Sequence, residues 1–208
     1  MKKHIIILLV LILILSEICL LSLSHIDVLN NYGKLMIVFM IVPIARIIEV
    51  FITFEFFWKV LIFYSILLFL SFYYSVRFKL DHGHKKEKLG FLPFAVAVGI
   101  GLGIMSQSLF MFNKYSWLIY FIPFIAYSEE ILFRGMIQNI LGKNLTASVA
   151  VLITALLYGV FSSGYGILFA SFMFLTGIVI GIVYSSTKNI FLAVVINFLV
   201  HYYLFVML

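Results

Sequence analysis

The sequence has very little charge. Only 11% of its 208 residues are Asp, Glu, Lys or Arg, whereas 65% are apolar or aromatic and the mean hydropathy is +1.23. Soluble domains carry about 25% charged and about 45–50% apolar residues, because a short chain needs polar side chains to cover its surface. This composition excludes a cytosolic enzyme, a secreted domain and a nucleic-acid-binding module. We expect the excess apolar surface to face lipid, so the first predicted partner is the bilayer and nucleic acid is not one.

Cysteine and the common protease metal motif are also scarce or absent. Cys19 is the single cysteine of the sequence, so neither a disulfide framework nor a cysteine metal site can be built. The His-Glu-x-x-His string of zinc proteases does not occur. An aspartyl intramembrane protease needs two aspartates within the membrane. Asp27 and Asp81 fall in predicted loops, so this class is excluded. We therefore expect no cofactor and assign no metal ligand.

Long apolar runs make up most of what is present. A helix needs about 20 apolar residues to cross the bilayer core, and the runs have this length. They lack the alternating pattern of about 10 residues that a barrel strand requires. The predicted fold is therefore all-α, a polytopic membrane helix bundle with about eight transmembrane helices. The predicted spans are 5–23, 35–55, 58–77, 91–112, 116–138, 146–163, 167–186 and 189–207.

One hydrophilic stretch, residues 79–88, divides the predicted spans into two groups. Residues 1–89 hold about three transmembrane helices and this basic loop, and residues 90–208 hold a core of about five. Both groups belong to one integral membrane domain. The breaks within the second group are so short that successive helices are expected to pack as antiparallel neighbours.

Two glycine patterns predict close contact between helices. Gly177-x-x-x-Gly181 and Gly99-x-Gly101-x-Gly103 lie within apolar runs, where small residues let neighbouring backbones approach. No strand precedes them, so they are not phosphate-binding loops.

Charges inside the spans are the places to look for function, because each costs a few kcal/mol unless it is paired or faces a wet cavity. Arg46 and Glu49 are three residues apart and are expected to form a structural ion pair. Glu17 is near the end of its span and can reach the interface.

The fifth span is different, because it contains two adjacent carboxylates and an arginine. Glu130 and Arg134 are four residues apart and can pair, whereas Glu129 is turned about 100° away and has no counter-ion on its own helix. A desolvated carboxylate accepts a proton readily, which is what a general base must do. The alternative is a packing motif without a catalytic role. One ion pair needs only one carboxylate, however, and burying a second costs additional free energy.

The Glu-Glu-x-x-Phe-Arg-Gly string that begins at Glu129 resembles the first signature motif of the CAAX-processing and bacteriocin-processing (CPBP, or Abi) membrane proteases. This family includes type II CAAX prenyl endopeptidases, lysostaphin-resistance protein A and bacteriocin self-immunity proteins. The resemblance covers roughly residues 90–205. It implies a multi-pass protease of the cell membrane, a bacterial plasma membrane by this likeness, that acts on a peptide, a membrane protein or a lipid-modified tail.

The same resemblance implies roles for particular residues. In the family the first glutamate activates a water and the second glutamate and the arginine support it, which gives Glu129 as base with Glu130 and Arg134 as support. The second motif of the family is Phe-x-x-x-His. Here Tyr158 stands at the aromatic position and Ser162 at the position of the histidine.

The third motif, His-x-x-x-Asn in the family, is reversed in this sequence as Asn197-x-x-x-His201. The spacing still puts an amide and an imidazole on one helical face. Both groups can donate a hydrogen bond to a developing oxyanion. The predicted catalytic residues are therefore Glu129, Glu130, Arg134, Asn197 and His201, with Ser162 as a further hydrogen-bond donor.

Two functions from different classes fit this pattern. The first is an intramembrane, glutamate-dependent endopeptidase. The alternative is a catalytically degenerate member of the family that acts as a bacteriocin-immunity protein or membrane scaffold, and Ser162 in place of a histidine is the feature that favours it. A small transporter is a weaker reading, because the spans show no paired inverted repeat.

Overall fold

The computed structural model describes residues 56–77, 80, 86–110 and 119–206. The predicted spans 5–23 and 35–55, with Glu17 and the Arg46–Glu49 pair, lie outside the described residues. In the described part, every element of regular secondary structure is a helix, as the composition predicts.

Each later predicted span has a helical counterpart, and most bounds differ from the prediction by a few residues. Three-ten turns lie at Lys86–Phe91 and Ser163–Tyr165, and a π-helix occupies Ile131–Gln138. The α-helices are α3 (Phe56–Arg77), α4 (Leu92–Leu109), α5 (Ile122–Glu130), α6 (Asn139–Asn144), α7 (Ala147–Phe161), α8 (Ile167–Thr187) and α9 (Ile190–Phe205).

Two of the described helices are long and apolar enough to cross a membrane, Leu89–Leu109 and Ile167–Thr187. Shorter apolar stretches lie within α3, α7 and α9, at Leu61–Tyr74, Ala147–Phe161 and Ile190–Phe205. The described residues are therefore all-helical with two helices that could cross a membrane, while the predicted number of about eight spans is not confirmed.

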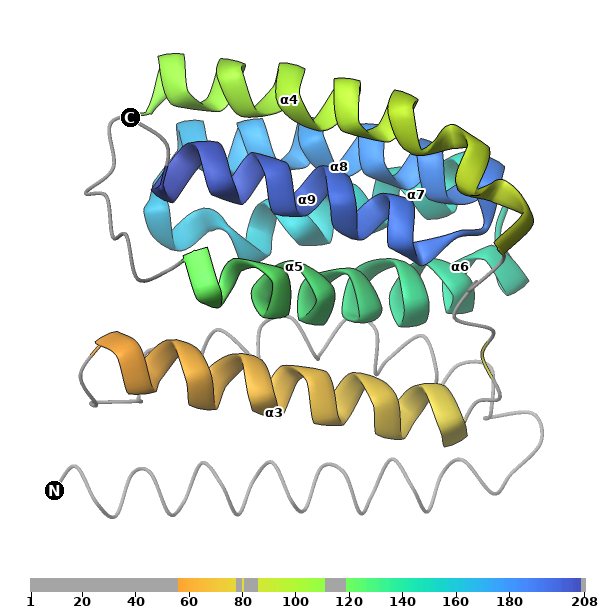
Figure 1. Cartoon of the computed structure of the whole chain (residues 1–208). Helices are drawn as coiled ribbons and strands as arrows, with labels where there is room; N and C mark the ends of the chain where they lie inside the picture. Colours follow the sequence, from red (N-terminus) through yellow and green to blue (C-terminus); the bar gives the residue numbers. More distant parts are fainter. Residues whose placement is uncertain (1–55, 78–79, 81–85, 111–118, 207–208) are drawn as a thin grey trace, which may run out of the picture.

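Helix α9 lies near the middle of the described helices. Figure 1 shows α9 lying between α4 and α5, with α7 and α8 behind α9 and α3 alongside α5. The pairwise contacts agree, since α9 packs against α4 and α5, α7 packs against α8, and α3 packs against α5. Large apolar side chains such as Phe69, Ile167 and Leu168 are exposed on the outer faces. These faces suit contact with lipid.

Local sequence sets where several helices begin and end. Pro93 and Pro123 lie in the first turns of α4 and α5, where a missing backbone N–H costs nothing. Gly166 has φ +104 immediately before α8, a conformation that L side chains rarely adopt. Asn189 caps α9, because its side-chain oxygen accepts a hydrogen bond of 2.9 Å from the Phe191 N–H.

The glycine patterns form close helix contacts, as the sequence predicts, with one exception. A Cβ on Gly99 would lie 2.7 Å from Leu199 Cδ1 of α9, and a Cβ on Gly181 would lie 2.9 Å from Val151 Cγ1 of α7. Gly103 and Gly177 face α9 and α7 in the same way. Gly101 has open space beside it and belongs to neither interface.

The predicted span 116–138 ends too early, because α5, the π-helix and α6 form one continuous rod that ends at Asn144. The helix end agrees with the predicted break at residues 142–144. Gln138 donates a hydrogen bond of 3.0 Å to Gly181 O, and Asn139 donates one of 2.9 Å to the Tyr184 hydroxyl. Their polar groups are satisfied by α8, so the helix continues past them.

Candidate active site

Glu129, in the last turn of α5, is 3% exposed and is surrounded by hydrogen-bond donors from three other helices. Its Oε1 accepts a hydrogen bond of 2.9 Å from the Tyr64 hydroxyl of α3. Its Oε2 lies 3.0 Å from the Tyr158 hydroxyl of α7 and accepts a bond of 3.0 Å from Asn197 Nδ2. His201 Nε2 lies 2.9 Å from the same oxygen. The carboxylate without a counter-ion on its own helix therefore gains its partners from α3, α7 and α9.

Tyr158 and Asn197 are also bonded to each other. The Tyr158 hydroxyl lies 2.9 Å from Asn197 Oδ1, so its single hydrogen is shared between this oxygen and Glu129 Oε2. Asn197 Nδ2 donates one of its two hydrogens to Glu129, and the second is available for another acceptor. Both side chains are fully buried, so the three polar groups form a closed network in an apolar interior.

The neighbouring carboxylate has a different environment. Glu130 Oε2 lies 3.2 Å from Arg134 Nε, and both side chains are fully buried. Arg134 Nη2 also donates a hydrogen bond of 3.1 Å to Gly177 O of α8, and its guanidinium carbon lies 5.0 Å from the centre of the Tyr158 ring. The ion pair therefore holds α8 and the tyrosine ring that contacts Glu129.

A π-helix begins immediately after Glu130 and contains Arg134 and Gln138. These two residues donate to Gly177 O and Gly181 O, which are also four residues apart on α8. The π-helix thus presents two polar side chains, four residues apart, to the backbone of one neighbouring helix. Such π segments are frequent at functional sites.

Comparison with known proteins finds one family model that matches part of this sequence. The family model Rce1-like, described as "Type II CAAX prenyl endopeptidase Rce1-like", matches residues 111–203. This match covers just under half of the chain and supports the CPBP/CAAX protease family. No curated protein and no solved structure matches the chain. At the family level the match supports a CAAX-type intramembrane protease, and Rce1-like proteins are membrane proteins.

The predicted site residues all fall within the range that the CAAX protease family matches. The structure brings Asn197 and His201 to Glu129, and Arg134 to Glu130. The reversed order of Asn197 and His201 therefore does not prevent both side chains from reaching the carboxylate, since either order puts them one turn apart on α9.

Ser162 is separate from this network. It is buried, and its hydroxyl donates a hydrogen bond of 3.0 Å to the carbonyl of Tyr158, one turn earlier in the chain. No contact described in the structure joins it to Glu129. The position at which the family has a histidine is therefore occupied by a hydroxyl bonded to its own backbone.

Sequence reasoning missed two residues of the network, Tyr158 and Tyr64. Tyr158 was placed only at the aromatic position of the second motif. Its hydroxyl was the available signal, because a buried tyrosine hydroxyl in an apolar helix needs a partner. Tyr64 lies outside the range that the family matches, among several tyrosines of α3, and nothing in the sequence distinguishes it.

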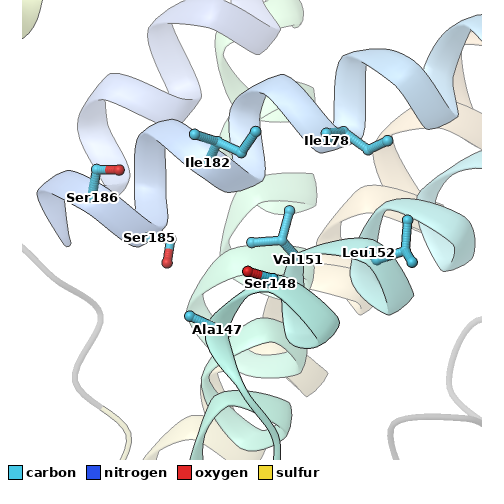
Figure 2. Close-up of a pocket in the computed structure, with 8 residues that line it drawn as sticks. All are labelled: Ala147, Ser148, Val151, Leu152, Ile178, Ile182, Ser185 and Ser186. Atoms are coloured by element: carbon cyan, nitrogen blue, oxygen red, sulfur yellow. The ribbon is translucent and has the colours of Figure 1, made fainter.

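The described residues contain no group of three or more His, Cys, Asp or Glu side chains placed to hold a metal ion. A groove of about 370 Å³ lies elsewhere, between α7 and α8 (Figure 2). Aliphatic and serine side chains form its walls, so it offers no group for acid–base chemistry. The lining residues are Ala147, Ser148, Val151, Leu152, Ile178, Ile182, Ser185 and Ser186.

Proposed function

We propose that this protein is a glutamate-dependent intramembrane endopeptidase in which Glu129 activates the attacking water. The observation that carries the proposal is the set of four donors around its carboxylate, which come from three helices. A carboxylate has about four lone-pair sites, two on each oxygen. Oε2 is crowded by three partners, whereas Oε1 has one described donor. A water can therefore bind at Oε1.

The reaction moves one proton in and out of Glu129. The carboxylate takes a proton from the water, and the water oxygen forms a bond to the carbonyl carbon of the substrate. Glu129 then returns the proton to the peptide nitrogen as the C–N bond breaks. The products are a carboxylic acid and an amine, and no co-reactant besides water is needed.

Asn197 and His201 are the proposed donors to the developing oxyanion. At rest both are directed at Glu129 Oε2. Once Glu129 has taken a proton, its oxygen is a weaker acceptor, and the second amide hydrogen of Asn197 and the imidazole N–H can serve the substrate carbonyl instead. Charge stabilisation thus passes from the base to the oxyanion at the step that needs it.

Glu130 and Arg134 support the site without touching substrate. Arg134 neutralises Glu130, holds the Gly177 carbonyl and lies beside the Tyr158 ring. These contacts fix the helix and the tyrosine that orient Glu129. The proposed substrate is a peptide, a membrane protein or a lipid-modified tail, which is the substrate class that the family suggests.

The test is Glu129→Gln, which keeps the size of the side chain and one strong acceptor oxygen. We expect cleavage of a prenylated CAAX peptide, and of an unmodified membrane-anchored peptide, to fall by about 100- to 10,000-fold, the range that a general base contributes. The protein should remain folded in the membrane. Glu87→Gln, the same change in the predicted basic loop, is the matched control.

The alternative of a degenerate immunity or scaffold protein makes the opposite prediction. A cellular phenotype that survives Glu129→Gln, with the protein still in the membrane, would favour binding over hydrolysis. Unchanged cleavage by Glu129→Gln would reject Glu129 as the base.

A further inference from the structure

The two oxygens of Glu129 differ in the burial of their partners. The partners of Oε2 are Tyr158, Asn197 and His201, all of which are buried. The donor to Oε1 is Tyr64, which is half-buried. The oxygen of Glu129 with a single described donor is therefore also the one whose protein partner is partly exposed.

Tyr64 holds this oxygen from a helix that the family match does not include. Its ring lies edge-to-face against Phe63, with centroids 5.1 Å apart and planes at 83°. It also packs against the buried cluster of Ile122 and Ile125 at the start of α5. The hydroxyl is therefore delivered to Glu129 by a packed ring on α3, and the match at residues 111–203 lacks this donor.

We propose that Tyr64 is a positioning residue for the hydrolysis proposed above. Its hydroxyl fixes the rotation of the Glu129 carboxylate, so that the remaining lone pair of Oε1 faces the attacking water. The lone pairs of a carboxylate oxygen lie in the carboxylate plane and point in different directions. One donor therefore fixes the direction that stays open for the other. The active site is completed by α3.

The experiment compares Tyr64→Phe with Tyr73→Phe in the full chain. Tyr64→Phe keeps the ring and its packing and removes only the hydroxyl. Tyr73 lies on the same helix and is 42% exposed, so Tyr73→Phe makes the same chemical change away from the site. The first measurement needs no substrate. The infrared carboxylate stretch of Glu129, assigned by its loss in Glu129→Gln, should shift in Tyr64→Phe and stay in place in Tyr73→Phe.

The second measurement is kinetic, with a prenylated CAAX peptide as the probe. For Tyr64→Phe we expect kcat to fall about 10-fold and KM to stay within about twofold, because the hydroxyl acts on the base and not on substrate binding. The thermal midpoint of unfolding should fall modestly relative to Tyr73→Phe, because one hydrogen bond to a buried carboxylate is lost. A role in folding alone would lower this midpoint and leave the kcat of the folded fraction unchanged.

The outcomes separate the two proposals. An unshifted carboxylate band, or a wild-type kcat in Tyr64→Phe while Glu129→Gln is inactive, overturns the role of Tyr64 and leaves Glu129 as the base. A Glu129→Gln protein that cleaves at the wild-type rate overturns the proposed function itself. A shifted band together with a reduced kcat supports both.

Discussion

Glu129 and Glu130 are adjacent in the sequence and equally buried, yet they have opposite surroundings. Glu129 contacts two tyrosine hydroxyls, an amide and an imidazole from three other helices. Glu130 faces the guanidinium of Arg134, one turn further along its own chain. The difference follows from the rotation of about 100° between successive residues of a helix.

In the proposed mechanism this rotation separates the reacting carboxylate from the supporting one. Hydrogen-bond donors stabilise a carboxylate and can leave a lone pair free for another partner, whereas a nearby arginine favours the charged form through its full positive charge. Glu129 therefore suits a group that reacts, and Glu130 suits a group that keeps Arg134 neutralised beside α8. Changes at the two positions should alter different measurements.

Arg134→Leu should break the ion pair with Glu130 and have the largest effect on stability. It leaves Glu130 as a buried charge without its cation and removes the hydrogen bond to Gly177 O. Removing one partner of a buried pair costs roughly 3–5 kcal/mol. We expect the free energy of unfolding, measured by denaturation in detergent, to fall by about this amount.

The control is the double variant Glu130→Gln/Arg134→Leu, which removes both charges. It should recover a large part of the lost free energy, since no buried charge is left unpaired. A double variant no more stable than Arg134→Leu would mean that the guanidinium acts through Gly177 and Tyr158 and not through Glu130.

Asn197→Ala should reduce cleavage strongly and have a smaller effect on folding. It removes one donor to Glu129 and the amide proposed for the oxyanion. Loss of one such donor costs about 100-fold or more in kcat. We expect this loss in the cleavage rate, while the free energy of unfolding falls by less than in Arg134→Leu. Asn144→Ala, at an exposed asparagine at the end of α6, is the control and should cleave at the wild-type rate.

The contrast between the two carboxylates was only partly predictable from the sequence. Helical spacing alone gives the Glu130–Arg134 pair and shows that Glu129 has no partner on its helix. The family resemblance adds Asn197 and His201, which lie 68 and 72 residues after Glu129 in the sequence. Tyr64 could not be found this way, because its contact depends on how α3 packs against α5, and the apolar sequence of α3 does not specify this packing.

The helix ends show the same limit. The predicted span ends at residue 138, and the polar residues 138 and 139 lie inside a helix that continues to Asn144. Their partners are a carbonyl and a hydroxyl on α8, which only the packed structure provides. Both differences from the prediction depend on contacts between helices that the sequence does not specify.

Ser162→Ala should have the smallest effect on cleavage. It tests whether Ser162 belongs to the group of residues that act on Glu129. The Ser162 hydroxyl donates to the carbonyl of Tyr158 on its own helix, so it has no hydrogen directed at Glu129. We expect the kcat of Ser162→Ala to stay within about twofold of wild type. Ser163→Ala, at the adjacent exposed serine, is the matched control. A tenfold loss confined to Ser162→Ala would show that this hydroxyl leaves its backbone partner during the reaction. It would then join the donors around Glu129 at the position where the family has a histidine.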